Sequence, residues 1–282
     1  MMRCSSMQKN SSLPSRVPRS QRGLSLIELM VGIVIGLLVV MAAVGSLVFT
    51  RVSSITVGDS SRLQQDASTA FRIIGHHIRQ GGARRVVEPI AGSSNVLFNG
   101  LYQGYGINPS TGSAAIVNGT EGAGNAPDVL QVSHDSEADL GATDCLGELP
   151  VAAAANNIQN RFFYTLNAQG AGELRCLGSG ATSAVTPAGF ALVQGVEDFQ
   201  VWYGFRAAGT DNVRYRTAGE LAVFAPVPWD QVESVMVCLR MRSDQANYQG
   251  VATTGCQNEA IAADGRVRRV FFRVFNIRNV GI

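Results

Sequence analysis

The hydrophobic pattern is strongest near the amino terminus, where an apolar run starts at Leu24 and continues to Phe49. A helix of about 20 residues crosses the hydrocarbon core of a bilayer, so the pattern predicts a transmembrane helix over residues 24–50. Glu28 is the one charged residue in this run. A carboxylate costs about 2.5–3.5 kcal/mol at the membrane centre and less near its edge, which makes Glu28 a candidate functional residue in need of a partner.

The pattern becomes amphipathic over residues 51–82, which predicts that the helix continues against a soluble domain. The apolar positions that follow helical spacing are Leu63, Ala67, Ala70, Phe71, Ile74 and Ile78. Gly81 and Gly82 supply a helix stop signal. The stretch from Val52 to Ser61 is rich in β-branched residues and serine, so a break in the helix is left open there.

Residues 83–282 are predicted to form a β-rich head domain. Residues 91–127 are rich in glycine, asparagine and serine and predict an irregular loop region with short strands at most. Beyond it the apolar period becomes two, and the expected strands are Asp128–Ser133, Arg161–Leu166, Glu173–Leu177, Glu197–Phe205, Val232–Arg242 and Arg268–Ile277. Their connections are too short for crossover helices, so a mainly antiparallel sheet is expected, with one face against the amphipathic helix. The fold class is therefore α+β.

The charge distribution separates a basic leader, residues 1–23, from the rest of the chain. The leader holds five basic residues and no acidic one, whereas the remaining chain has 18 basic and 21 acidic residues. Residues 24–282 thus carry a net charge of −3, which gives no argument for nucleic-acid binding. The positive leader favours a cytoplasmic amino terminus, with the head on the far side of the membrane.

Four cysteines follow the leader: Cys145, Cys176, Cys238 and Cys256. An even number in a domain across the membrane predicts disulfides, and four cysteines allow three connectivities. The pairs Cys145–Cys176 and Cys238–Cys256 are favoured because their members are near in sequence and flank expected strands. Each would contribute roughly 3–4 kcal/mol by the loop-entropy estimate. A zinc site is the alternative, but the chain has no C-x-x-C spacing.

The residues around Gly23 supply a partner for Glu28. Cleavage after Gly23 would leave an ammonium group on Leu24, four residues before Glu28. This arrangement resembles the type IV prepilin signature of basic leader, glycine, apolar run and glutamate in fixed register. The resemblance implies cleavage by prepilin peptidase, methylation of the new amine, and pairing of Glu28 with the amino terminus of a neighbouring subunit. The family favours phenylalanine at the first mature position, where this chain has Leu24.

Secretory signals and ordinary signal anchors also contain apolar runs of this general kind. A secretory signal has an apolar core of only 7–15 residues, whereas Leu29–Phe49 contains 21 residues without a charge. An ordinary signal anchor would place Glu28 at the positive end of the helix dipole without further purpose. Gly32 and Gly36 lie on the helix face of Glu28 and predict close packing against other pilin helices, although glycine is common in spanning helices generally.

Several later stretches resemble PilW-type minor pilins in their order and spacing: Asp144–Gly147, Asn160–Tyr164, Glu173–Cys176, Leu192–Phe199, Arg268–Phe271 and Ile277–Asn279. The resemblance implies a low-abundance subunit that primes filament assembly near the pilus tip. The implied partners are other minor and major pilins, prepilin peptidase, the inner-membrane assembly machinery and a large tip adhesin. The rival functions are a type II secretion pseudopilin, a tip-exposed adhesive or DNA-binding pilin, and a plain membrane-anchored domain.

Candidate chemistry outside the amino-terminal segment is sparse. His76 and His77 are adjacent on a helix and point in different directions, so they do not form an i, i+4 metal pair. The best calcium candidates are Asp135, Glu137, Asp139 and Asp144, but their spacing fails the EF-hand pattern and predicts a solvated acidic loop. Trp202 and Trp229 are expected in the core. A solvated strand face is expected for Arg266, Arg268, Arg269, Arg273 and Arg278, and a partner-docking stripe is the alternative.

Familiar catalytic loops are also missing from the sequence. No G-x-S-x-G or G-x-G-x-x-G motif occurs, and the only lysine, Lys9, lies in the leader, which excludes a Walker A loop from the mature chain. The sequence therefore predicts a protein that is not an enzyme and uses no cofactor or metal.

Overall fold

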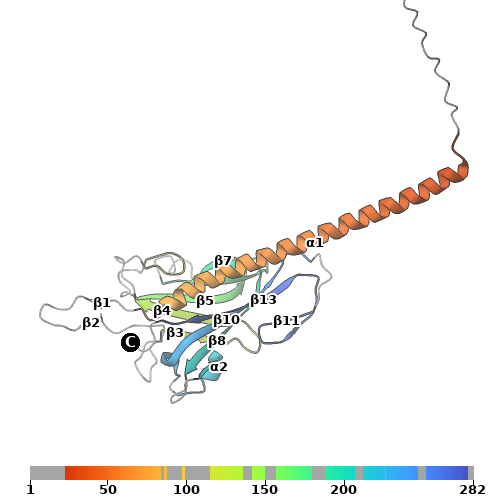
Figure 1. Cartoon of the computed structure of the whole chain (residues 1–282). Coiled ribbons are helices and arrows are strands. Elements are labelled where there is room, and N and C mark those ends of the chain that lie inside the picture. Colours follow the sequence, from red (N-terminus) through yellow and green to blue (C-terminus); the bar gives the residue numbers. More distant parts are fainter. Residues whose placement is uncertain are drawn as a thin grey trace, which may run out of the picture. The chain divides into compact units, whose positions relative to one another are not determined.

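The computed structural model describes residues 23–83, 86–87, 97–98, 115–135, 142–149, 157–179, 188–206, 212–225, 227–246 and 252–278 (Figure 1). The chain divides into two compact units, Met1–Arg51 and Val52–Ile282. Helix α1, Leu26–Gln80, begins in the first unit and ends in the second. Most of the glycine-rich region and the leader before Gly23 lie outside the described residues.

Helix α1 is continuous through Val52–Ser61, so the break left open by the sequence does not occur. Thr56 donates its hydroxyl to the carbonyl oxygen of Val52 at 2.9 Å, and Thr50 does the same to Ser46 at 2.8 Å. These bonds satisfy the hydroxyls within the helix. The β-branched residues lower helix propensity only slightly, which is too little to interrupt so long a helix.

Helix α1 ends at the predicted glycines. The N–H of Gly81 donates to the carbonyl of His77 at 2.8 Å, and Gly82 has a φ of 73°, a left-handed conformation that glycine adopts at low cost. The N–H of Gly82 then donates to the carbonyl of Ser133 at 3.0 Å. The helix stop therefore also joins α1 to the neighbouring sheet.

The head contains two principal antiparallel sheets, where the sequence predicted one. The first has the order β3-β4-β5-β6-β7 and the second the order β13-β10-β8-β9. The strands of the first are Val117–Thr120, Val129–Asp135, Asn157–Leu166, Gly172–Leu177 and Phe190–Gln194, in chain order. The second comprises β8 Val196–Arg206, β9 Val213–Arg216, β10 Val232–Arg242 and β13 Arg268–Asn276.

Gly195 separates the two sheets. It lies between β7 and β8 with a φ of 76°, and its carbonyl accepts a hydrogen bond from the N–H of Arg242 at 2.8 Å. A left-handed residue at this point redirects the chain, so β7 and β8 join different sheets. The remaining elements are short: β1 Val86–Val87, β2 Leu97–Phe98, β11 Thr253–Thr254, β12 Ala260–Ile261, α2 Ala218–Leu221 and a 3-10 turn at Trp229–Gln231.

The core lies between the amphipathic part of α1 and the sheets. All six apolar positions predicted from helical spacing are buried, and so are Val235, Val237, Leu239 and Met241 on one face of β10. Trp229 packs edge-on against Tyr203, with ring centroids 4.9 Å apart. Trp202 was wrongly placed in the core: strand alternation puts it on the opposite face from buried Val201 and Tyr203, where it is half-buried beside Phe272.

Gly75 allows α1 to approach β13 closely. A Cβ atom at this position would overlap the ring of Phe275, whereas a Cβ at the exposed Gly58 would meet no atom within 4 Å. Gly75→Val is expected to lower the free energy of unfolding of the head by about 1–3 kcal/mol, because the core is overpacked. Gly58→Val is the matched control and should change it by less than about 0.5 kcal/mol. Chemical denaturation of the detergent-solubilised chain measures both, and equal effects in the two variants would contradict the role of Gly75 in close packing.

Candidate functional site

Ser25 caps the amino terminus of helix α1. Its hydroxyl oxygen accepts a hydrogen bond from the N–H of Glu28 at 3.2 Å, and its carbonyl accepts one from the N–H of Leu29 at 3.1 Å. A serine at this position satisfies one of the backbone donors that every helix start leaves unpaired. Gly23 and Leu24 precede the cap and are exposed, so the predicted scissile bond lies immediately outside the helix.

Glu28 lies in the first turn of α1 and is exposed. The positive end of the helix dipole favours a carboxylate there, typically by 0.3–1 kcal/mol. That effect is smaller than the cost of a carboxylate near the membrane centre. The helix alone therefore does not compensate for Glu28 if this turn enters the hydrocarbon region.

The apolar part of α1 is exposed along its whole length. Every residue from Leu26 to Thr50 is exposed, and α1 is the one helix among the described residues that is long and apolar enough to cross a membrane, judged by length and composition. Gly32 and Gly36 leave open space where a side chain would lie. Because they are four residues apart, they form a smooth strip on one helix face, suited to a second helix.

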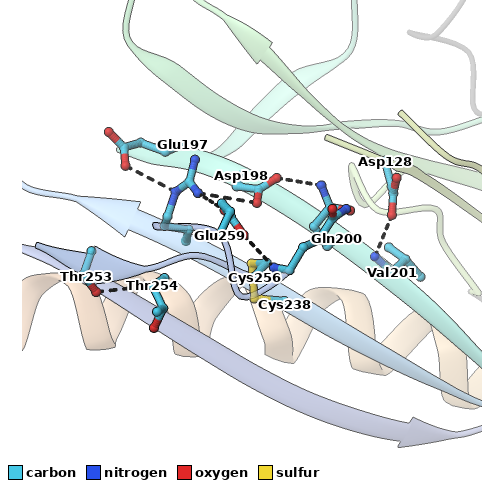
Figure 2. Close-up of a disulfide and its surroundings, with 12 residues drawn as sticks. Asp128, Glu197, Asp198, Gln200, Val201, Cys238, Thr253, Thr254, Cys256 and Glu259 are labelled. Carbon is cyan, nitrogen blue, oxygen red and sulfur yellow. Dashed lines mark hydrogen bonds and ion pairs between the residues drawn. A yellow bond between two sulfur atoms is a disulfide. The ribbon is translucent and has the colours of Figure 1, made fainter. Parts of the chain in front are cut away.

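Two disulfides join the pairs of cysteines that the sequence favoured. Cys145 is bonded to Cys176 on β6, and Cys238 on β10 is bonded to Cys256 in the β11–β12 hairpin. Figure 2 shows the second disulfide beside Gln200 and Glu259. The side chain of Gln257 donates to Gln200 at 2.7 Å, and Gln200 donates to Asp198 at 2.9 Å. The hairpin is thus attached to the sheet by both covalent and hydrogen bonds.

The arginines expected on one solvated strand face divide into two groups. Arg268 is only 9% exposed and binds both carboxylate oxygens of Glu197, at 2.7 and 2.9 Å. It also binds Asp264, and its hydrogen bonds lower the pKa of that carboxyl to about 2. Arg266 binds Asp264 and the backbone carbonyl of Asp244. The expectation of solvation was therefore wrong for Arg266 and Arg268, whereas Arg269, Arg273 and Arg278 are exposed.

Asp144 does not belong to a solvated acidic loop. It is buried, and its Oδ1 atom accepts backbone N–H groups of Leu146 at 2.9 Å and Glu148 at 3.0 Å. The carboxylate thus stabilises its own turn in the way that aspartate commonly does. Glu137, Asp139 and the side chain of Asp135 lie outside the described residues. The described residues contain no cluster of metal-ligating side chains.

His77 and His134 form a buried pair that the sequence did not predict. Their rings are stacked with centroids 6.1 Å apart, while His76 is exposed. Asn160 accepts the N–H of Cys145 through its Oδ1 atom at 2.7 Å, so its amide group donates to Nδ1 of His77 at 3.2 Å. Neither ring nitrogen of His134 meets a hydrogen-bond partner among the described residues.

This environment favours neutral imidazoles. Burial, and then the neighbouring histidines, lower the pKa of His77 to about 3. Burial and His76 lower that of His134 to about 4. No local pattern in the sequence connects His77 with His134. The sequence analysis also missed Ser25, which the helix-start pattern Ser25-x-x-Glu28 could have indicated.

Two family models match the chain. The prokaryotic N-terminal methylation motif matches residues 18–44, and type IV pilus-assembly protein W (PilW) matches residues 161–279. The chain therefore contains a prepilin-type methylation motif and a region that matches PilW. The first match contains the predicted scissile bond, Ser25, Glu28 and both helix-face glycines, and the second extends from β5 to the end of β13. The sequence-based resemblance to both patterns is therefore confirmed.

A type IV-like pilin from Thermus thermophilus is similar in structure at 13% identity, covering 78% of this chain and 98% of its own, with a TM-score of 0.42. No curated protein matches the chain. The chain thus combines an apolar helix that carries the methylation motif with a region that matches PilW.

Proposed function

We propose that this pilin-like protein is a minor pilin that helps to initiate and assemble type IV pili and is incorporated near the pilus tip. The observation that carries the proposal is the joint presence of the methylation motif at residues 18–44 and the PilW domain at residues 161–279. The methylation motif lies on the helix that is proposed to pack in the filament. The PilW domain lies in the head and distinguishes the chain from a protein that is simply anchored in the membrane.

The proposed sequence of events starts with the chain in the inner membrane, its amino terminus in the cytoplasm and its head in the periplasm. Prepilin peptidase cleaves between Gly23 and Leu24, and the new amine is methylated. Helix α1 then leaves the lipid and packs against other major and minor pilins through its Gly32–Gly36 strip. Two observations support this lateral packing: the apolar helix is exposed throughout, and both glycines face open space.

Cleavage is tested by expressing the full chain with and without prepilin peptidase and determining the amino terminus by mass spectrometry. The wild-type chain should begin at Leu24 only when the peptidase is present, with its amine methylated. Gly23→Leu should remain uncut, because a bulky side chain replaces hydrogen at the scissile position. Gly45→Leu is the matched control, since this glycine also lies in open space but is remote from the cut. A mature amino terminus elsewhere in the wild-type chain would overturn the proposal.

The priming role is tested separately by deleting the gene and counting surface pili. We expect a severe loss of pili that the wild-type gene restores. Normal pili would remove the priming role while leaving the processing result intact. A loss of type II secretion with normal pili would identify a pseudopilin instead.

A further inference from the structure

Strand β13 forms one edge of the second sheet. In the order β13-β10-β8-β9, its nine residues pair with β10 on one side, and no described strand pairs with the other side. An edge of this kind presents a row of unpaired backbone N–H and C=O groups that another extended chain can bind. β13 is also longer than β9, the four-residue strand at the opposite edge.

The two faces of β13 differ in chemistry. On the face away from α1, Phe272 and Val274 are 52% and 48% exposed, and the Phe272 ring lies 6.3 Å from that of Trp202. On the face toward α1, Phe275 is buried, and the guanidinium of Arg273 lies 5.9 Å from the Phe71 ring centroid. The exposed residues Phe272 and Val274 are thus apolar on one face, whereas on the other face the exposed Arg269 and Arg273 alternate with Phe271 and Phe275.

The cationic face has no anionic partner within the described part of the chain. Arg269 and Arg273 on β13, and Arg79 on α1 above Phe275, are exposed and form no ion pair with any described carboxylate. This contrasts with Arg268 on the same strand, whose two carboxylate partners neutralise it. The charge beside the edge is therefore available to a ligand.

We propose that the open edge of β13 binds an extended segment of another protein in which acidic and apolar side chains alternate. Its backbone would extend the sheet by one strand, the mode known as β-augmentation. Because side chains alternate across a strand, its acidic residues would face Arg269 and Arg273, and its apolar residues would cover Phe272 and Val274.

A second copy of this chain does not supply such a segment from its described sheet edges. Strand β9 reads Val213-Arg214-Tyr215-Arg216, which is apolar and basic and would be repelled. The other two edges of the principal sheets, β3 and β7, contain no acidic residue. The described sheet edges of a second copy thus do not match this charge pattern, and the proposal assigns the occupant to a different protein.

The test uses the full chain in nanodiscs and synthetic nine-residue peptides of alternating glutamate and valine. One peptide is unmodified and the other is N-methylated at every residue, so only the first can donate hydrogen bonds along either of its edges. If β13 binds a strand, the unmodified peptide binds at least tenfold more tightly than the N-methylated one in fluorescence anisotropy. A lysine–valine version of the better peptide should bind at least tenfold more weakly.

The double variant Arg269→Glu/Arg273→Glu should reverse the preference between the glutamate and lysine peptides. Arg214→Glu on the opposite edge is the matched control and should leave both affinities unchanged. Equal binding of the unmodified and the N-methylated peptide would exclude strand pairing, and binding of neither would show that the arginines protect the edge against pairing. Either result overturns the proposal. The peptide measurement requires no pilus assembly, so its result does not depend on whether the protein primes pilus assembly.

Discussion

Acidification from pH 7 to pH 4.5 is expected to destabilise the head strongly, through the buried pair His77 and His134. In the unfolded chain each imidazole binds a proton near pH 6.5, whereas in the folded chain the pKa values are about 3 and about 4. Below pH 6.5 the unfolded state therefore binds more protons than the folded state. Stability is fully present above this pH and is lost as the pH falls toward the folded pKa values.

The expected loss follows from these values. At pH 4.5 the two histidines together remove about 5 kcal/mol relative to neutral pH. Asp128 acts in the opposite direction, because burial raises its pKa to about 6 and the folded state takes up that proton first. This offsets about 2 kcal/mol over the same range. The remaining loss of about 3 kcal/mol is a large share of the 5–15 kcal/mol typical of a folded domain.

Urea denaturation at a series of pH values measures this effect. His134→Leu should remove about 2.5 kcal/mol of the acid-dependent loss and so leave less than about 1 kcal/mol of it. It should not destabilise the head at pH 7, because both ring nitrogens lack partners among the described residues. His76→Gln is the matched control: this neighbouring histidine is exposed, and it lowers the two pKa values less than burial does, so its pH profile should change less than that of His134→Leu. Parallel profiles for wild type and His134→Leu would contradict the assignment.

The regular elements were predictable because their patterns are local. Strand β10 was predicted with its observed bounds, since its apolar residues alternate without interruption and become the buried face. Strands β7 and β9 were missed because they contain only five and four residues, which is too short for an alternation of apolar and polar positions to be recognised. Helix α2 was also missed, although Thr217 and Glu220 form a capping box that the sequence displays.

Features that depend on distant pairing were not predictable. The contact between His77 and His134 requires the end of α1 to lie at one particular position along β4, which is fixed by the Gly82–Ser133 hydrogen bond. The division into two sheets depends on the turn at Gly195, and the sequence offered many glycines of equal appearance. The amino-terminal segment was different, because its pattern lies within a few consecutive residues. Sequence alone therefore identified Gly23, Leu24 and Glu28 as candidates.

Glu28 is expected to determine entry into the filament, and its two possible roles can be separated. If Glu28 only stabilises the start of the helix, it contributes what a negative charge contributes at the positive end of a helix dipole, about 0.3–1 kcal/mol. If it pairs with the amine of a neighbouring subunit in an apolar environment, removing its charge leaves that amine unpaired. The cost of an uncompensated charge near the membrane centre is about 2.5–3.5 kcal/mol, which corresponds to roughly a hundredfold change in an equilibrium.

Glu28→Gln removes the charge while keeping the side chain's size and its hydrogen-bonding capacity. It should reduce the protein in sheared pili by about a hundredfold, while cleavage after Gly23 and the amount in the membrane remain unchanged. Ser25→Ala is the matched control, because it removes the cap that accepts the N–H of Glu28 but keeps the charge. The loss of this cap costs about 1 kcal/mol, which should reduce incorporation of the protein into pili by no more than about fivefold. Equal losses in the two variants would assign Glu28 to the helix start alone, and undiminished incorporation of Glu28→Gln would mean that the carboxylate has no assembly partner.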